Sequence, residues 1–143
     1  MSDSIQTQTA PAPVGVYPHA RRVGDLLFLS GIGPRTPGSN VIPGNVYTVD
    51  GSLAGYDIAA QCRQVFANVR AVLEASGAQW QDLVDVTVYL TDMARDFETY
   101  NAIWAEHFPE PSQAPCRTTL GITALPTQIA VELKCIAAIP EGR

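Results

Sequence analysis

Two charged side chains in the C-terminal third of the chain are of types that can act on a small organic acid. They are Arg117, in a segment that reads P-C-R-T-T-L-G, and Glu132, in a segment that reads V-E-L-K-C-I-A. An arginine binds a carboxylate through two parallel hydrogen bonds, and a glutamate can orient or deprotonate a water molecule. The same pair is also typical of a cross-strand ion pair on a solvated sheet face, and the pattern alone leaves both interpretations open.

The elements that would position this pair are predicted to be two strands. Both segments alternate polar and apolar residues with a period of two, which is typical of half-buried strands. The short connection A-L-P-T at residues 124–127 predicts a hairpin. In that hairpin Thr119 lies opposite Glu132, and Arg117 lies diagonal to it at about 7–8 Å between backbones. We therefore expect Arg117, Thr119 and Glu132 together on the face of the sheet away from the core.

A second group of polar candidates lies near the start of the chain. Residues 15–22 read G-V-Y-P-H-A-R-R and hold Tyr17, His19, Arg21 and Arg22 in a segment that Pro18 keeps out of a helix. A plain lead into a strand, with two solvated arginines, is the alternative interpretation.

The segment that follows combines a short strand with a glycine-containing turn. Residues 26–30 form an apolar run that predicts a strand buried on both faces. It is followed by S-G-I-G-P at residues 30–34. Glycines such as Gly31 let the backbone approach a ligand closely, and exposed N–H groups beside Ser30 can bind an oxyanion. The turn is too short for a phosphate-binding loop and contains no lysine.

The remaining pattern predicts an α+β two-layer sandwich. Residues 57–76 have helical spacing of apolar residues, with Asp57 as N-cap and Gly77 at the C-terminal end. A second amphipathic helix is expected at 96–108, and strands at 85–91 and near 45–49. Two helices then cover one face of a roughly six-stranded mixed sheet. The uncovered face mixes charged and apolar residues, so we expect copies of the chain to bury it, with ligand sites at the subunit boundaries.

Composition limits the function classes. The 143 residues suit one domain, expected at 15–143 after a flexible arm at 1–14. A net charge of −5 disfavours nucleic-acid binding. No apolar run is long enough to span a membrane, and no secretory signal is visible. Three scattered cysteines are expected to be reduced, which favours the cytoplasm, and two distant histidines give no metal-ligand spacing.

Seven motifs in order resemble the RidA/YjgF family of enamine/imine deaminases. They read G-V-Y-P-H-A (15–20), F-L-S-G (28–31), N-V-R-A-V-L-E-A-S-G (68–77), D-V-T-V-Y-L-T-D-M (85–93), Y-N-A-I-W (100–104), P-C-R-T-T (115–119) and V-E-L-K-C-I-A (131–137). The resemblance implies a chorismate-mutase-like fold, a homotrimer with clefts between neighbouring subunits, and no metal or organic cofactor.

The resemblance also implies roles for individual residues. Arg117 matches the arginine that holds the substrate carboxylate, and Glu132 matches the acid that positions the attacking water. Tyr17 and Ser30 match residues that line the cleft, and Asn101 matches a supporting asparagine. Two departures stand out. Thr119 occupies a position where the family often has cysteine, and the turn after Ser30 reads G-I-G-P-R where the family commonly has G-Q-I or G-Q-L.

Two loop segments are most similar to the 2-aminomuconate deaminase subgroup. They read Y-P-H-A-R-R and S-G-I-G-P-R-T-P-G. This implies that a conjugated enamine with two carboxylates, from tryptophan (kynurenine-pathway) or aminophenol breakdown, is converted to 4-oxalocrotonate and ammonia. Arg117 can bind only one carboxylate, so His19, Arg21, Arg22 and Arg35 are candidates for the other.

Three other functions remain open from the sequence. They are a generic deaminase of 2-aminoacrylate-type enamines and imines, a trimer that binds a small ligand without catalysis, and a ribonuclease. Arg117 and Glu132 together favour the enzyme, and the acidic composition counts against the ribonuclease.

Overall fold

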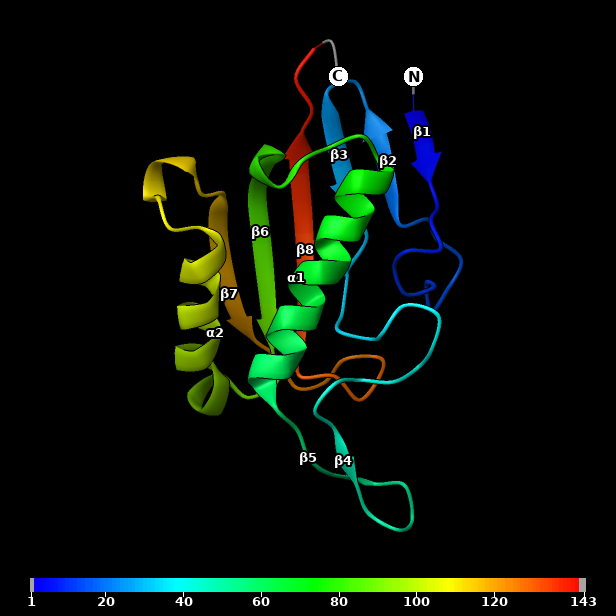
Figure 1. Ribbon diagram of the computed structural model, residues 1–143, viewed down its shortest axis with the longest axis vertical. Coiled ribbons are helices and arrows are strands. Elements are labelled where there is room, and N and C mark those ends of the chain that lie inside the picture. The colour runs from blue at the N-terminus through cyan, green and yellow to red at the C-terminus, as the bar shows by residue number, and fades with distance from the viewer. Residues whose placement is uncertain (1, 142–143) are drawn as a thin grey trace.

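The computed structural model describes residues 2–141, which form two layers, a sheet and a pair of helices (Figure 1). Two single 3₁₀ turns, Trp80–Asp82 and Pro111–Gln113, complete the regular structure. In chain order the strands and α-helices are β1 (Ser2–Ile5), β2 (Ala20–Val23), β3 (Leu26–Leu29), β4 (Val46–Tyr47), β5 (Leu53–Gly55), α1 (Ile58–Ala75), β6 (Leu83–Leu90), α2 (Met93–His107), β7 (Cys116–Gly121) and β8 (Val131–Ala138).

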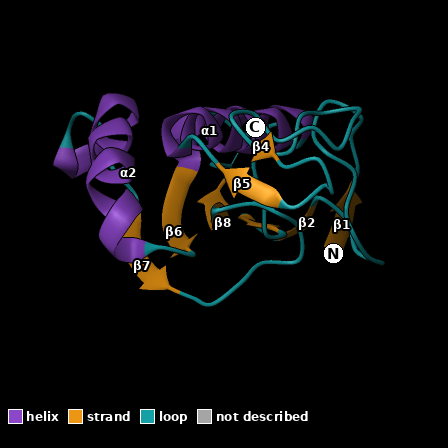
Figure 2. Ribbon diagram, turned by 90° about the horizontal axis from the view of Figure 1, so that it is seen from below, coloured by secondary structure: helices purple, strands orange, loops and turns teal. Residues whose placement is uncertain are grey.

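The main sheet has six strands in the order β1-β2-β3-β8-β6-β7, and β4 and β5 form a separate small hairpin. Strands β6 and β7 are parallel, while the other neighbouring pairs are antiparallel. Figure 2 shows the helices on one side of the strands. The predicted α+β architecture, with a six-stranded mixed sheet and two helices on one face, is therefore confirmed.

Local signals explain where the two helices begin and end. The Asp57 side chain accepts a hydrogen bond from the N–H of Ala60 at 3.2 Å, which caps α1. Gly77, with φ of 78°, supplies the left-handed residue after the helix. Helix α2 begins at Met93, three residues before the expected start, because the side chain of Asp92 caps it by accepting from the N–H of Arg95.

The predicted hairpin between the two C-terminal strands is wrong. Strand β6 lies between β7 and β8 and pairs with both. The physical reason is the crossover through α2: a strand, a helix and a second strand in succession place β7 parallel to β6. The chain then returns from β7 through residues 122–130 to the far side of β6.

The register on β6 assigns the neighbouring residues to a face. Val86 and Val88 are buried under the helices. Val86 lies beside Arg117 on one side and Cys135 on the other, and Val88 lies beside Thr119. Residues that are opposite one another on neighbouring strands point to the same face. Arg117 and Thr119 therefore belong to the helix-covered face, contrary to expectation.

Glu132 belongs to the other face, which we call the open face because no helix covers it. Its neighbour on β6 is Tyr89, whose other neighbour is Leu120 of β7. Leu26 and Phe28 of β3 are 42% and 37% exposed, while Leu27 and Leu29 are fully buried. Strand β3 is thus buried on one face in the single chain, where burial on both was expected.

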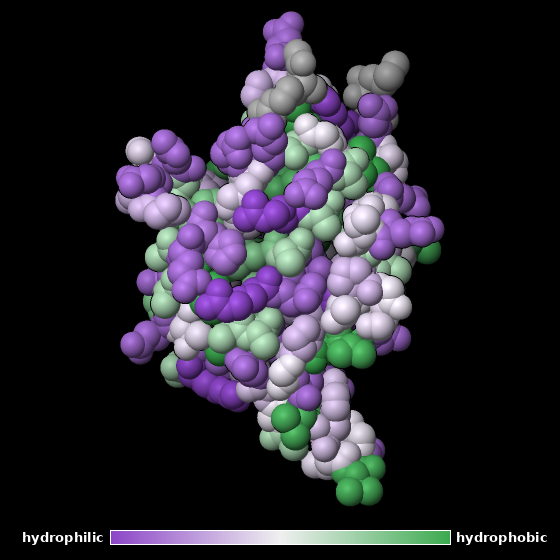
Figure 3. All heavy atoms as spheres, in the orientation of Figure 1, coloured by the Kyte–Doolittle hydropathy of each residue, from purple (hydrophilic) through white to green (hydrophobic). Residues whose placement is uncertain are grey.

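Residues 2–14, expected as a flexible arm, contribute to the fold in this structure. Strand β1 extends the sheet by pairing with β2, and Ala10 is buried in the core. The β4–β5 hairpin projects from the opposite end of the molecule (Figure 1) and shows apolar atoms at its tip (Figure 3). Val46 and Val49 are among the most exposed apolar residues there.

Candidate functional site

Glu132 lies in a recess formed where three loops meet the end of β8. We call it the Glu132 recess. It is an open hollow of about 570 Å³, a volume that includes open solvent. The loops come from three distant parts of the chain. The recess is lined by Val14, Tyr17, Gly31, Gly33, Arg35, Pro126, Thr127, Ile129 and Glu132.

The turn after β3 runs directly beside the Glu132 carboxylate. The backbone N–H and carbonyl of Ile32 each form a 2.9 Å hydrogen bond with Leu133, which fixes the turn against β8. A Cβ atom at Gly31 would lie 2.8 Å from Oε2 of Glu132. Any side chain at this position would therefore displace the Glu132 carboxylate.

The environment of Glu132 favours its neutral form. The side chain is partly buried, and this burial raises the pKa of the carboxyl above its ordinary value of 4.5. Within residues 2–141 the ion pairs join Arg63 to Glu106 and Arg95 to Asp96, so Arg117 does not pair with Glu132.

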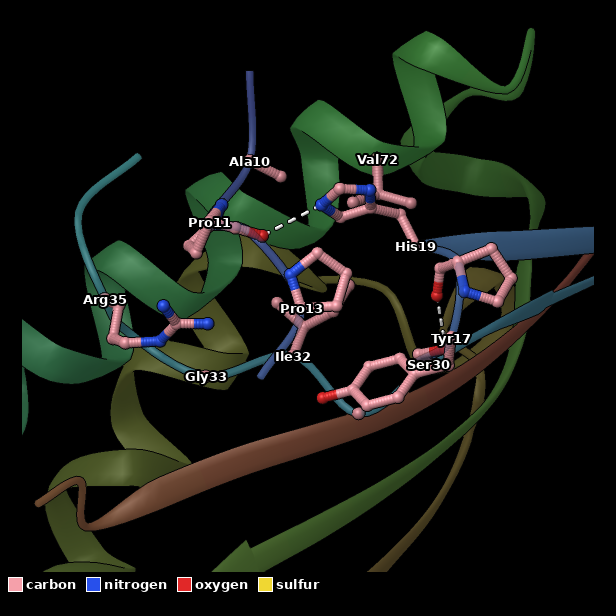
Figure 4. Close-up of a pocket in the computed structure, with 12 residues that line it drawn as sticks. Ala10, Pro11, Pro13, Tyr17, His19, Ser30, Ile32, Gly33, Arg35 and Val72 are labelled. Carbon is pink, nitrogen blue, oxygen red and sulfur yellow. Dashed lines mark hydrogen bonds between the residues drawn. The ribbon is translucent and has the colours of Figure 1, made fainter. Parts of the chain in front are cut away.

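A second pocket adjoins this recess and shares four of its lining residues (Figure 4). The shared residues are Tyr17, Gly31, Gly33 and Arg35. Arg35 donates a hydrogen bond from Nη2 to the carbonyl of Ala12, which holds its side chain at the boundary between the two hollows. Ser30 also lines the pocket, and its hydroxyl donates to the carbonyl of Pro18 at 2.7 Å.

His19 lines the same pocket but is occupied by backbone contacts. Its Nδ1 accepts a hydrogen bond from the N–H of Thr7 at 3.3 Å, which leaves Nε2 to donate to the carbonyl of Pro11 at 2.8 Å. The imidazole is 7% exposed. His19 therefore holds residues 7–11 against the domain, and both ring nitrogens are already used.

Arg117 and Thr119 lie on the other face of the sheet, next to α2; together with Asn101 they form what we call the Arg117 edge. The guanidinium carbon of Arg117 is 5.0 Å from the ring centroid of Trp104, a cation–π distance. The hydroxyls of Thr119 and Tyr100 are buried, and neither has a hydrogen-bond partner within the described residues. Asn101 is exposed on α2.

The two predicted catalytic residues are thus far apart within one chain. Arg117 is level with Cys135 across β6, two strand spacings away, which is about 10 Å. Cys135 is three residues beyond Glu132, which adds about 10 Å along the strand. The two side chains also point to opposite faces.

Arg21 and Arg22 do not line either pocket. Arg22 donates from Nε to the carbonyl of Gly24 at 3.1 Å, in the β2–β3 turn. Arg21 lies opposite Phe28 on the open face. Of the four candidates for a second carboxylate site, Arg35 is the one whose side chain lines the Glu132 recess.

The sequence analysis missed two amides that hold this recess. Gln61 and Asn68 of α1 are buried and bond the loops that form its walls. The sequence did contain a signal for them, because both are polar residues at positions where the helical pattern of α1 calls for apolar ones. No three His, Cys, Asp or Glu side chains within residues 2–141 are grouped to hold a metal ion, and no helix in the same range is long and apolar enough to cross a membrane.

Comparison with known proteins agrees with this geometry. The family model described as endoribonuclease L-PSP matches residues 7–139. The chain belongs to this family, which is the RidA/YjgF family. The matched range includes both the Glu132 recess and the Arg117 edge.

Three similar proteins align with nearly the whole chain. The 2-iminobutanoate/2-iminopropanoate deaminase of Escherichia coli is 33% identical over 138 residues, 96% of this chain and 98% of that protein. A RutC family protein of Pyrococcus horikoshii is 36% identical over 137 residues, 96% of this chain and 98% of that protein. The crystal structure of RidA from an Antarctic Psychrobacter superposes with a TM-score of 0.81 at 34% identity, covering 96% of this chain and 99% of that one.

Proposed function

We propose that this chain is a deaminase of small carboxylate-bearing imines and enamines. The observation that carries the proposal is the partly buried Glu132 carboxyl, which faces an open recess beside a glycine turn. Partial burial raises the pKa of this carboxyl above 4.5, which favours its taking up and returning a proton. Similarity to the Escherichia coli imine deaminase over nearly the full length supports the same reaction class.

The proposed reaction proceeds through proton transfers. An enamine first takes up a proton at carbon and becomes a protonated imine. Glu132 removes a proton from water as the water oxygen bonds to the imine carbon, giving a neutral carbinolamine. Glu132 then returns that proton to the amine; as the C–N bond breaks, the hydroxyl group releases a proton to solvent, which replaces the one taken up at carbon, and a 2-oxo acid and ammonia leave. Such acid–base assistance contributes about 10²–10⁴-fold in rate.

Arg117 is the proposed carboxylate anchor, and its position requires a second copy of the chain. Within one chain it lies on the helix-covered face, while Glu132 lies on the open face. One substrate molecule can meet both only if the Arg117 edge of one subunit approaches the Glu132 recess of another. A homotrimer, in which each of three boundaries forms one site, satisfies this requirement.

The open face supports such an association. Val23, Leu26, Phe28 and Leu120 are 47%, 42%, 37% and 43% exposed. The first three lie on neighbouring strands β2 and β3, and Leu120 lies at the β7 edge. Contiguous apolar side chains on one sheet face are typical of protein interfaces.

The proposed substrate within this class is 2-aminomuconate, with a generic 2-aminoacrylate-type substrate as the alternative. Arg35 favours the dicarboxylate, because it places a second cation in the recess that holds Glu132. Its guanidinium contacts a backbone carbonyl, which a substrate carboxylate can replace with a stronger, charge-assisted bond.

Ammonia release tests the proposal directly. We expect the wild-type protein to accelerate ammonia release from 2-iminobutanoate, formed in situ by an amino acid oxidase, and from 2-aminomuconate. Absence of acceleration with both substrates would refute the deaminase function. Arg35→Ala tests the finer assignment: we expect the KM for 2-aminomuconate to rise about tenfold or more, and the KM for 2-iminobutanoate to change less than about twofold. An equal effect on both substrates would leave only the generic deaminase.

A further inference from the structure

The buried face of α1 contains two amides among apolar side chains. Gln61 and Asn68 are 0% and 1% exposed. They are seven residues apart, which is two helical turns, so they lie on the same face of the helix. Burying an amide costs free energy unless its polar atoms are hydrogen-bonded. Their bonding partners therefore show what these two residues do.

Asn68 holds the turn that follows β3. Its Nδ2 donates to the carbonyl of Gly33 and to the carbonyl of Arg35, both at 2.8 Å. Its Oδ1 accepts from Nε2 of Gln64 at 2.9 Å, which fixes the orientation of the amide. Gly33 and Arg35 both line the Glu132 recess, so Asn68 anchors one of its walls.

Gln61 holds the segment that leads into β8. Its Oε1 accepts from the N–H of Ala130 at 2.8 Å, two residues before Glu132. Its Nε2 donates to Oδ1 of Asn45 at 2.9 Å, and Nδ2 of Asn45 donates to the carbonyl of Gln128 at 2.8 Å. Gln61 therefore anchors the wall formed by residues 126–129.

The two walls touch one another between these anchors. A Cβ atom at Gly33 would lie 2.7 Å from Cδ1 of Ile129, so the walls approach as closely as a glycine allows. Apart from the single bridge between Ile32 and Leu133, neither wall contains regular secondary structure. Besides that bridge, α1 holds both walls from behind through Asn68 and Gln61.

We propose that Gln61 and Asn68 are positioning residues that act on different parts of the proposed reaction. Asn68 sets the wall that carries Arg35 and the glycine turn, and therefore governs substrate binding. Gln61 sets the backbone that leads into Glu132, and therefore governs the chemical step. This inference rests on the proposed deaminase function for its kinetic consequence, and on the hydrogen bonds alone for its structural consequence.

Steady-state kinetics with 2-aminomuconate, the substrate proposed to contact Arg35, separates the two roles. We expect Asn68→Ala to raise KM about tenfold with kcat within about threefold of wild type. We expect Gln61→Ala to lower kcat about tenfold with a smaller change in KM, because displacing a catalytic group by about 1 Å is costly. Gln64→Ala and Asn45→Ala, which remove the partners of the two amides at less buried positions, should give smaller shifts of the same kinds.

Val65→Ala is the matched control, because Val65 is fully buried on the same helix and has no polar side-chain atom. Even if Val65→Ala lowers the Tm as much as the two amide variants do, it should change KM and kcat less than about twofold. If Asn68→Ala and Gln61→Ala gave the same kinetic changes as Val65→Ala, the two amides would be merely structural and the inference would be overturned.

Amide hydrogen exchange tests the inference without activity. We expect Asn68→Ala to speed exchange within residues 31–36 and Gln61→Ala to speed exchange within residues 127–131, each leaving the other wall unchanged. Uniform acceleration in both variants would overturn the inference. A wild-type protein that releases no ammonia but shows the wall-specific exchange would refute the deaminase function while leaving the positioning roles intact.

Discussion

The Glu132 recess and the Arg117 edge differ in how they are built. The recess is formed by three loops, held by backbone hydrogen bonds and buried amides, around a partly buried acid. The Arg117 edge is an outer strand beside a helix, where a guanidinium lies over an aromatic ring and two buried hydroxyls have no partner within the described chain. The loops of the recess are held by hydrogen bonds to α1, whereas the hydroxyls of Thr119 and Tyr100 beside Arg117 are buried without a partner within residues 2–141.

In the proposed function, each region is half of a site. The recess supplies a proton-transfer group but only Arg35 as a cation. The Arg117 edge supplies a cation and hydroxyls, and its predicted residues include no carboxylate. Because they are on opposite faces of one sheet, no rotamer change within a chain can unite them. The following variants test whether the recess governs the chemical step and the Arg117 edge governs substrate binding.

Glu132→Gln is expected to have the largest effect. The change keeps the shape of the side chain and removes the base, so kcat should fall about 10²–10⁴-fold while KM changes little. Steady-state kinetics with 2-iminobutanoate measure both. Losses of similar size in kcat and KM would indicate that Glu132 is structural.

The dependence of the wild-type kcat on pH also tests the role of Glu132 as a base. Glu132 must be deprotonated to act as a base, and burial raises the pKa of its carboxyl above 4.5. The kcat should therefore fall as the pH falls through a value above 4.5, and Glu132→Gln should lack this acid limb. For stability the sign is opposite: a carboxyl with a raised native pKa favours the folded state at low pH, and this contribution is lost as the pH rises through that pKa.

Arg117→Ala should mainly raise KM. Hydrogen bonds to charged groups contribute about 1.5–3 kcal/mol each, so losing the carboxylate anchor should raise KM by about 10–100-fold. Arg70→Ala is the control, because Arg70 also lies over an aromatic ring, with its guanidinium carbon 4.2 Å from the ring centroid of Trp80. That variant should leave kinetics unchanged. Wild-type KM in Arg117→Ala would remove Arg117 from the site.

Gly31→Ala should have a smaller effect that is confined to the recess. The new methyl group would meet Oε2 of Glu132 at 2.8 Å, so the flexible carboxylate has to move. We expect kcat to fall about tenfold with little loss of stability. Gly55→Ala is the control, since a Cβ atom there would meet nothing within 4 Å. Unchanged kcat in Gly31→Ala would show that the position of the carboxylate is not critical.

Periodicity predicted most of the fold because both helices and the longer strands bury one regular stripe. It could not predict which strands are neighbours. The alternation around Arg117 is equally compatible with a hairpin and with a crossover strand, and it does not reveal which face meets the helices. The order strand, helix, strand at residues 83–121 did contain the signal for a parallel pair.

The sequence indicated several residues of the candidate site, but it did not indicate how all of them are arranged within the chain. Tyr17, Gly31, Arg35 and Glu132 do share one recess, although they are up to 115 positions apart. His19 and Arg22 contact the backbone carbonyls of Pro11 and Gly24, and short-range sequence could not indicate these contacts. Gln61 and Asn68 were missed because helical periodicity shows only that they lie on the buried face. It does not show that their amides bond to loops far away in the sequence.

Subunit complementation tests the central claim most directly. Arg117→Ala chains keep a complete Glu132 recess, and Glu132→Gln chains keep a complete Arg117 edge. In a homotrimer assembled from equal amounts of both, about a quarter of the boundaries join an intact recess to an intact edge. At a substrate concentration well below the KM of Arg117→Ala, co-refolded or co-expressed mixtures should therefore regain about a quarter of wild-type ammonia release, whereas Arg117→Ala alone keeps about a tenth or less and Glu132→Gln alone about a hundredth or less. If the mixture stayed as inactive as its components while mixed trimers were shown by mass spectrometry, the two residues would not form a shared site and the account would be wrong.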